Sequence, residues 1–161
     1  YWEQVVVMND YQRDRFVKRV IRNMFNTVVD KRIVLMGFAF KADTGDTRES
    51  PAIYVARQLL EERAQVVVTD PQALPNARRD LADVADRVEF AEDPYAAAQG
   101  AHALLVLTDW QVYGELDYER IHAAMAKPAF VFDGRDAVDH QKLHEIGFNV
   151  LPIGSAPRLH I

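Results

Sequence analysis

The stretch RIVLMGFAFKADTGDTRESPA, residues 32–52, decides the predicted fold. It begins with a continuous apolar run, as expected for a strand that is covered on both faces of a parallel sheet. A loop rich in charged residues follows, and Ser50-Pro51 then predicts the N-cap and the first residue of a helix. A strand, a loop and a helix in this order indicate a βαβ unit.

The same alternation continues along the rest of the chain. Further strands are predicted in five apolar runs, at residues 65–71, 87–90, 102–110, 128–135 and 148–154. Helical patterns lie between them, at residues 93–100, 117–125 and 139–147, and Asp93-Pro94 is predicted to open the first of these helices. The polar segment after the second strand is compatible with a helix. The sequence therefore predicts an α/β fold with a Rossmann-like, doubly wound, mostly parallel six-stranded sheet. The tail after Gly154 is expected to be frayed.

A long helix is predicted before the first strand, from about residue 10 to residue 30, with Asn9 as its N-cap. This gives residues 1–30 as a linker or dimerisation helix and residues 31–161 as the globular domain. Apolar residues recur on one face of the helix. Three of them, Phe16, Val17 and Val20, are expected to be exposed unless this domain or a second copy of the chain packs against them. Arg15, Lys18, Arg19 and Arg22 fall on the other face, which is either simply solvated or binds an anion or a partner.

The bulk composition suits one ordinary domain, with 161 residues, 49% of them hydrophobic and 27% charged. A net charge of −5 argues against nucleic acid as a partner. No apolar run is long enough to predict a membrane span, and no secretory signal opens the chain, so a cytoplasmic location is expected. The chain contains no cysteine, which excludes a cysteine nucleophile and thiolate metal sites within it. Because it starts at Tyr1 and enters a helix at once, we expect a piece of a longer polypeptide.

Charged residues follow several predicted strands, at the edge where doubly wound sheets bind their ligands. Lys41 and Arg48 flank the loop after the first strand, and Arg135 follows the fifth. Lysine and arginine are phosphate ligands, and Phe40 could pack on a base or a sugar. The alternative is that Lys41 and Arg48 only form surface ion pairs with the acidic residues of the loop, which are Asp43, Asp46 and Glu49.

Other chemistries find less support in the residues. A dinucleotide fingerprint needs three closely spaced glycines, but this loop has only Gly37 and Gly45, although Asp70 could bind a ribose hydroxyl at the end of the second strand. His140 and His144 have the spacing of metal ligands on a helix, yet no further ligand set accompanies them, so exposed histidines and no metal are expected. Two further aromatic residues, Trp110 and Tyr113, are expected to cover the core.

The residues also carry a resemblance to a known family. The loop GFAFKADTGDTRESPA is similar to the signature loop in the C-terminal, UDP-binding domain of the UDP-glucose/GDP-mannose dehydrogenase family. The similarity extends to MNDYQRDRF, FNTVVDKRIVLMGFAF, DPYAAAQGAHALLVLTDW, ELDYERIHAAMAKPAFVFDGR and IGFNV, and so covers nearly the whole chain in order. TGDTRES and LDYERIHAAMAKPAFVFDGR most resemble the UDP-glucose 6-dehydrogenase branch.

The resemblance implies a role within a larger NAD-dependent enzyme that oxidises UDP-glucose to UDP-glucuronate with two NAD. Phe40, Lys41 and Arg135 match the family's substrate contacts, and Arg48 matches an arginine that contacts the NAD side. An N-terminal NAD domain of the same protein and a homo-oligomer are implied as partners, as is a role in polysaccharide biosynthesis. Since the family's catalytic cysteine and NAD glycines have no counterpart here, the chain is expected to be inactive alone and to contain no catalytic residue. The alternatives are a stand-alone, non-catalytic nucleotide-binding or oligomerisation module, or a sister dehydrogenase for GDP-mannose or UDP-N-acetylmannosamine.

Overall fold

A computed structural model describes residues 2–161, with side chains described from residue 12 onward. Its six strands form one parallel sheet in the order β3-β2-β1-β4-β5-β6. The strands are β1 (Arg32–Met36), β2 (Gln65–Thr69), β3 (Val88–Phe90), β4 (Ala103–Val106), β5 (Phe130–Asp133) and β6 (Asn149–Pro152). The predicted α/β fold, with its doubly wound six-stranded sheet, is confirmed.

The centre of the sheet is apolar on both faces. From Ile33 to Met36, no residue of β1 is more than 1% exposed, and Leu104 and Leu105 of the neighbouring β4 are equally buried. β1 pairs with β2 from Arg32 opposite Gln65, and with β4 from Ile33 opposite Ala103. The continuous apolar run that predicted a doubly covered strand is thus the central strand of the core.

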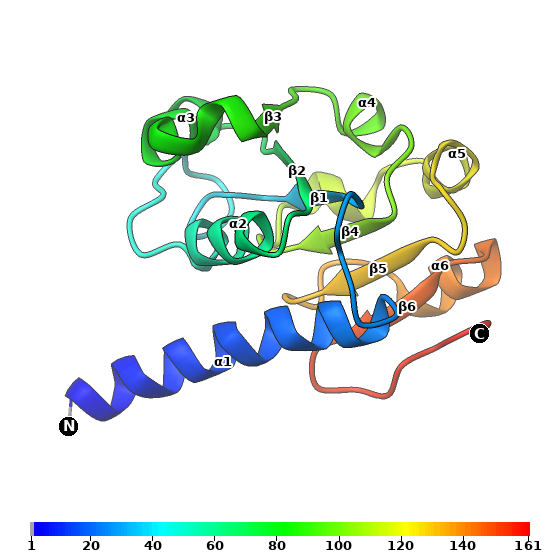
Figure 1. Ribbon diagram of the computed structural model, residues 1–161. Helices are drawn as coiled ribbons and strands as arrows, with labels where there is room; N and C mark the ends of the chain where they lie inside the picture. Colours follow the sequence, from blue (N-terminus) through cyan, green and yellow to red (C-terminus); the bar gives the residue numbers. More distant parts are fainter. Residues whose placement is uncertain (1) are drawn as a thin grey trace.

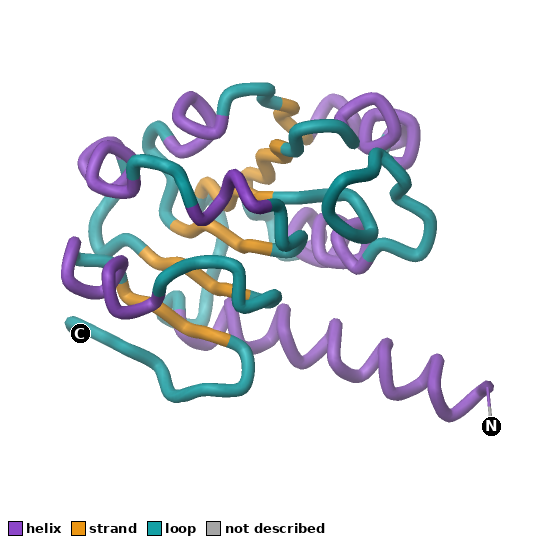
Figure 2. The backbone as a smooth tube through the Cα atoms, turned by 180° about the vertical axis from the view of Figure 1, so that it is seen from behind, coloured by secondary structure: helices purple, strands orange, loops and turns teal. Residues whose placement is uncertain are grey.

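Helices cover both faces of the sheet (Figures 1 and 2). On one face α1 (Trp2–Asn23) packs against α2 (Pro51–Glu61), and α3 (Leu74–Asp80) contacts β2. On the other face α4 (Pro94–Ala98), α5 (Tyr118–Ala124) and α6 (His140–Ile146) contact one another in series. Two 3-10 helices complete the chain, η1 (Ala82–Arg87) and η2 (Gln111–Gly114). This arrangement brings the loops that follow β1, β2, β4 and β5 to one edge of the sheet.

The first helix differs from the prediction at both ends. It begins at Trp2, so Asn9 lies within it rather than capping it, and it ends at Asn23 instead of residue 30. Phe25 and Asn26 both have a φ of 64°, a left-handed conformation that a right-handed helix cannot continue through. The N-terminal half of α1 projects beyond the sheet, and the two ends of the chain lie on opposite sides of the molecule (Figures 1 and 2).

The domain itself covers the apolar face of α1. Val17 is 5% exposed, and Val20 and Met24, which directly follows the helix, are 1% exposed, all within the same core cluster as the strands. Phe16 is partly buried and packs against this cluster. The sequence left open whether this domain or a second copy covers Val17 and Val20. In the structure, this domain covers them.

The helix caps follow the sequence closely. Ser50 accepts a hydrogen bond from the Ala52 N–H and donates one to the Phe38 carbonyl at 2.8 Å, which ties the start of α2 to the end of β1. Asp93 caps α4 through the Tyr95 N–H. These are the caps that the Ser-Pro and Asp-Pro pairs predicted.

The C-terminal tail is more ordered than the sequence suggested. Val150 and Arg158 form an antiparallel bridge, and the His160 N–H donates to the Asn149 side chain at 2.7 Å. The His160 ring stacks on that of His144, with 4.1 Å between the centroids. The expectation of a frayed tail was therefore wrong, because backbone pairing with β6 holds it against the domain. Among the helices that the structure describes, none is both long enough and apolar enough to cross a membrane.

Candidate nucleotide-binding edge of the sheet

Close packing against β4 shapes the start of the charged loop after β1. Gly37 has a φ of +98°, and a Cβ atom there would lie 2.5 Å from the Cβ of Thr108. The Thr108 hydroxyl donates to the Ala39 carbonyl at 2.8 Å. Only glycine fits this position without displacing the neighbouring strand end, so the loop leaves the sheet in a fixed direction.

Asp70, at the end of β2, joins three strand ends through one buried carboxylate. It accepts the N–H groups of Phe38 and Ala39 at 2.7 and 3.0 Å, and the Trp110 indole N–H at 3.2 Å. The N–H groups of Gln72 and Ala73, both at 2.8 Å, complete its five donors. Asp70 is only 3% exposed, so the suggestion that it binds a ribose hydroxyl was wrong. Its acceptor sites are used to hold the loops that surround it.

Phe40 and Lys41 lie just beyond this anchored base. The Phe40 N–H donates to the Asp46 carbonyl at 2.7 Å, which closes the loop, while the Phe40 side chain is 46% exposed. Lys41 is also exposed, and no ion pair joins it to the described part of the chain. An aromatic residue and a cation are therefore adjacent in the sequence, on a backbone that hydrogen bonds hold in place, and both are open to solvent.

The second cation of the loop is paired. The Arg48 guanidinium contacts the Asp46 carboxylate at 2.8 Å, and Asp46 also accepts the Arg48 N–H. Hydrogen bonds from the Arg48 side chain and backbone lower the pKa of Asp46 to about 2, and those from Asp46 raise the pKa of Arg48. The Arg48 side chain is still 85% exposed. The surface ion pair considered from the sequence is therefore formed by Arg48.

Arg135 lies at the end of β5, in a turn that Asp133 organises. The Asp133 carboxylate accepts the N–H groups of Arg135, Ala137 and Val138 at 2.9–3.1 Å. The Arg135 guanidinium lies 3.5 Å from Asp109, which follows β4. The structure thus brings together the TDW and DGR segments, as their positions at neighbouring strand ends predicted.

His140 also contacts this turn, which corrects the view that both histidines of α6 are exposed. Its Nε2 lies 2.8 Å from Asp133, and its side chain is only 15% exposed. Asp133, Asp136 and His140 place potential ligand atoms within 4.8 Å of one another. Because the Asp133 carboxylate already serves three N–H groups and the histidine, turn formation accounts for this cluster.

Two of the aromatic residues considered from the sequence belong to the core. Trp110 and Tyr113 are 6% and 2% exposed, as expected, and burial raises the pKa of Tyr113.

Sequence reasoning missed the anchoring roles of Asp70, Thr108 and Asp133. Each ends a strand or follows one within two residues, and this position is the signal that could have indicated an anchoring role.

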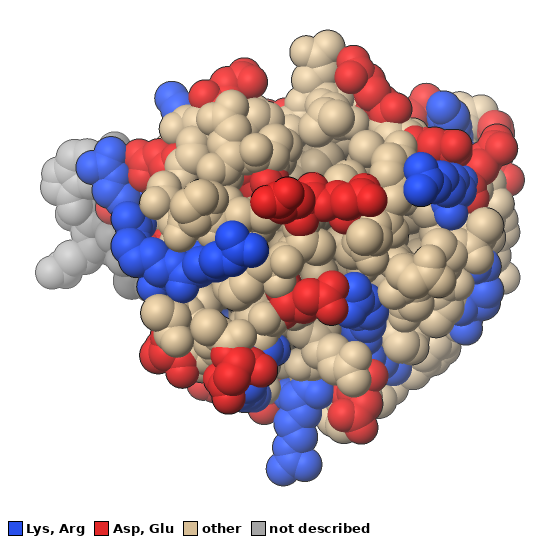
Figure 3. Space-filling model, turned by 90° about the horizontal axis from the view of Figure 1, so that it is seen from above, with Lys and Arg blue, Asp and Glu red and all other residues tan. Residues whose placement is uncertain are grey.

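Basic and acidic side chains are interspersed on the face seen from above, rather than gathered into one basic surface (Figure 3).

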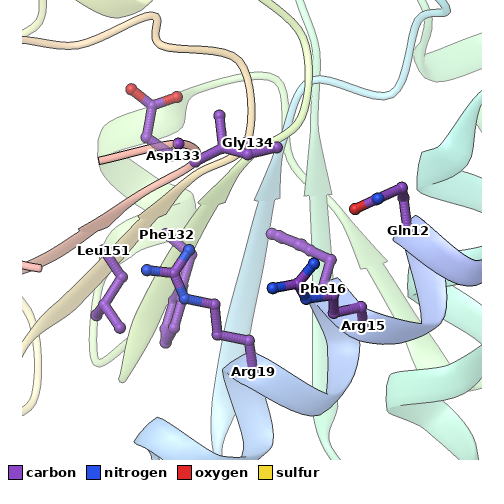
Figure 4. A pocket seen from close by; sticks show the side chains of 10 residues that line it. Gln12, Arg15, Phe16, Arg19, Phe132, Asp133, Gly134 and Leu151 are labelled. Atoms are coloured by element: carbon purple, nitrogen blue, oxygen red, sulfur yellow. The ribbon is translucent and has the colours of Figure 1, made fainter. Parts of the chain in front are cut away.

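A cavity of about 370 Å³ lies between α1 and the ends of β5 and β6 (Figure 4). Phe40, Lys41, Arg48 and Arg135 do not line it. The candidate residues therefore form an open edge rather than the wall of that cavity.

The fold and this edge define a Rossmann-like α/β domain, a class in which the strand ends hold the ligand site. Residues 34–140 match the model of the UDP binding domain of the UDP-glucose/GDP-mannose dehydrogenase family, and the chain belongs to this family. It is 49% identical to the UDP-glucose 6-dehydrogenase of Bos taurus and 48% identical to UDP-glucose 6-dehydrogenase 1 of Oryza sativa subsp. japonica. Each comparison covers 96% of this chain, but only 33% and 36% of the respective relative, so the chain spans about a third of their length.

Solved structures agree with this assignment. A UDP-glucose dehydrogenase from Pyrobaculum islandicum matches with a TM-score of 0.71 and 30% identity, over 91% of this chain and 32% of that one. An NDP-N-acetyl-D-galactosaminuronic acid dehydrogenase from Methanosarcina mazei shares the fold, with a TM-score of 0.73 at 21% identity over 89% of this chain and 29% of its own. The expected family and fold are therefore confirmed.

Proposed function

We propose that this chain is the UDP-sugar-binding part of an NAD-dependent UDP-glucose 6-dehydrogenase, which oxidises UDP-glucose to UDP-glucuronate with two NAD. The observation that carries the proposal is the exposed Phe40-Lys41 pair on an anchored loop, in a chain 48–49% identical to proteins of that name. A planar base can pack on Phe40, and the ammonium group of Lys41 can neutralise a diphosphate.

Arg135 and Arg48 take different parts in this proposal. Arg135 would exchange its contact with Asp109, at 3.5 Å, for a charge-assisted hydrogen bond to the substrate. Arg48, 85% exposed, would reach toward the NAD side of the complete enzyme. The chain would not form a dinucleotide site of its own, since bulky residues separate Gly37 from Gly45 and the Asp70 carboxylate already accepts five hydrogen bonds. NAD would therefore be bound mainly by a domain outside this sequence.

The proposal also covers the organisation of the whole enzyme. Residues 1–30, which are helical up to Asn23, would be the end of a central linker or dimerisation segment, and residues 31–161 the substrate-nucleotide domain. The N-terminal NAD domain of the same protein would supply the catalytic cysteine that this sequence lacks, and the enzyme would work as a homo-oligomer. On its own, the chain would bind UDP and catalyse nothing.

A calorimetric titration of this chain with UDP, with GDP as the comparison, tests the proposal. We expect UDP to bind selectively, and Lys41→Ala and Arg135→Ala each to weaken binding by roughly 10- to 100-fold, because each removes a charge-assisted contact of about 1.5–3 kcal/mol. Lys142→Ala, which removes an exposed lysine of α6, is the matched control and should leave the affinity unchanged.

Three results would count against this function. Preference for GDP would point to a sister dehydrogenase. Equal losses in Lys41→Ala and Lys142→Ala would show that only net charge is sensed. Absence of UDP binding by both this chain and the full-length protein would overturn the assignment of the loop.

A further inference from the structure

The cavity beside α1 differs in character from the open edge described above. Its walls come from α1 and from the ends of β5 and β6. Figure 4 shows the guanidinium groups of Arg15 and Arg19 directed from α1 toward these strand ends. Phe16, Phe132 and Leu151 supply apolar surface, and Arg15 and Arg19 supply charge. A volume of about 370 Å³ is within the range of small-ligand sites, which begins at roughly 300 Å³.

One of the two arginines is fixed in place. The Arg19 Nη1 donates to the Pro152 carbonyl at 2.8 Å, which holds the guanidinium against the end of β6. Arg15 lies one turn earlier on the same face of α1, and no hydrogen bond or ion pair joins it to the described residues. The other three basic residues of this helix do not line the cavity. Lys18 pairs with Asp14 at 2.9 Å, and the Arg13 guanidinium lies over the Tyr54 ring.

Among the described residues that line the cavity, none has a free carboxylate to balance these charges. Asp133 is the acidic residue in its lining, and its side chain is 0% exposed and already accepts three N–H groups and a histidine. Its carboxylate is directed away from Arg19 (Figure 4). Like charges four residues apart on a helix repel each other, and the pKa of Arg19 is lowered by burial and by Arg15. An oxyanion between the two guanidinium groups would relieve this repulsion.

We propose that this cavity is a second binding site, for a small molecule that carries a phosphate or carboxylate group on a flat, apolar body. The forked donors of Arg15 and Arg19 match the oxygens of such a group. The two phenylalanines and Leu151 cover the body of the ligand. The site is separate from the proposed UDP contacts, since Arg135 does not line the cavity and its guanidinium faces Asp109.

Titration of the full chain with phenyl phosphate and with benzoate tests this site, and benzyl alcohol serves as the neutral analogue. All titrations are repeated with saturating UDP present. We expect at least one of the two anions to bind, benzyl alcohol to bind at least tenfold more weakly, and UDP to leave the anion affinity unchanged. Whichever anion binds more tightly identifies the group that the site prefers.

Two variants separate the site from general electrostatics. Arg15→Gln should weaken anion binding at least tenfold, whereas Arg22→Gln, with the same charge change outside the cavity, should alter it less than twofold. Arg15 is exposed, so its variant is expected to fold. The proposal would be overturned if neither anion bound saturably, or if the two substitutions weakened anion binding equally. Loss of anion binding in Lys41→Ala, with Arg15→Gln unaffected, would assign the anion to the UDP loop instead.

Discussion

At the scale of single residues, anchoring groups prepare the edge of the sheet before any ligand arrives. Gly37 allows the loop to pass against Thr108, and Asp70 then fixes the following backbone with a single carboxylate. Neither group touches the proposed substrate. Their contribution is to keep Phe40 and Lys41 in one orientation, which lowers the entropy lost when a ligand binds.

Gly37→Ala should therefore destabilise the protein strongly. The new methyl group would lie 2.5 Å from the Thr108 Cβ and would also be strained at a φ of +98°, so we expect a loss of about 2–4 kcal/mol in the free energy of unfolding. Gly100→Ala is the matched control, because its φ is +71° but nothing lies within 4 Å of the added carbon. Urea denaturation should show a loss of about 1 kcal/mol there. Similar losses in the two variants would mean that backbone strain, not the Thr108 contact, makes glycine necessary.

At the scale of elements, the sequence predicted the strands and most helix starts because their signals are local. Continuous apolar runs marked buried parallel strands, and Ser50 and Asp93 marked the caps of α2 and α4. The end of α1 could not be predicted in this way, since no proline or glycine stops it and two residues adopt a left-handed backbone instead.

The candidate site was predicted unevenly for the same reason. Strand order alone brings the loops after β1, β4 and β5 to one edge, so Lys41 and Arg135 could be chosen from their positions. The five donors to Asp70 and the contact of His140 with Asp133 depend on tertiary packing, which the sequence does not display. Identical residues at strand ends can bind a ligand or hold a loop, and only their partners distinguish the two roles.

The charged loop itself should respond to acid in a defined way. Arg48 lowers the pKa of Asp46 from 3.8 to about 2, so the ion pair is complete above pH 3.8 and is lost as the pH falls through about 2. An NMR titration of the Asp46 carboxyl carbon should show this midpoint, and Arg48→Gln should move it upward toward 3.8. Asp43→Asn, a change in the same loop, should not move it. An unchanged midpoint in Arg48→Gln would show that the pair does not form in solution.

At the scale of the whole molecule, the C-terminal half of α1 is part of the domain core. Val17, Val20 and Met24 lie in the same cluster as the central strands, and Arg19 bonds to the end of β6. Through these contacts the helix packs on the sheet and forms one wall of the proposed anion cavity. Loss of the helix should then unfold the sheet as well.

Val20→Ala, measured with two probes of unfolding, tests this coupling. Val20 is 1% exposed, so its truncation should lower the free energy of unfolding by about 2 kcal/mol. In a Trp2→Phe background, the fluorescence of Trp110 reports on the strand ends, while far-UV circular dichroism includes the 22 residues of α1. Both midpoints should fall together in Val20→Ala, and Arg22→Ala should change stability by no more than about 0.5 kcal/mol. If the helical signal is lost while Trp110 remains buried, α1 unfolds separately from the sheet. The cavity that α1 lines would then open without unfolding of the sheet.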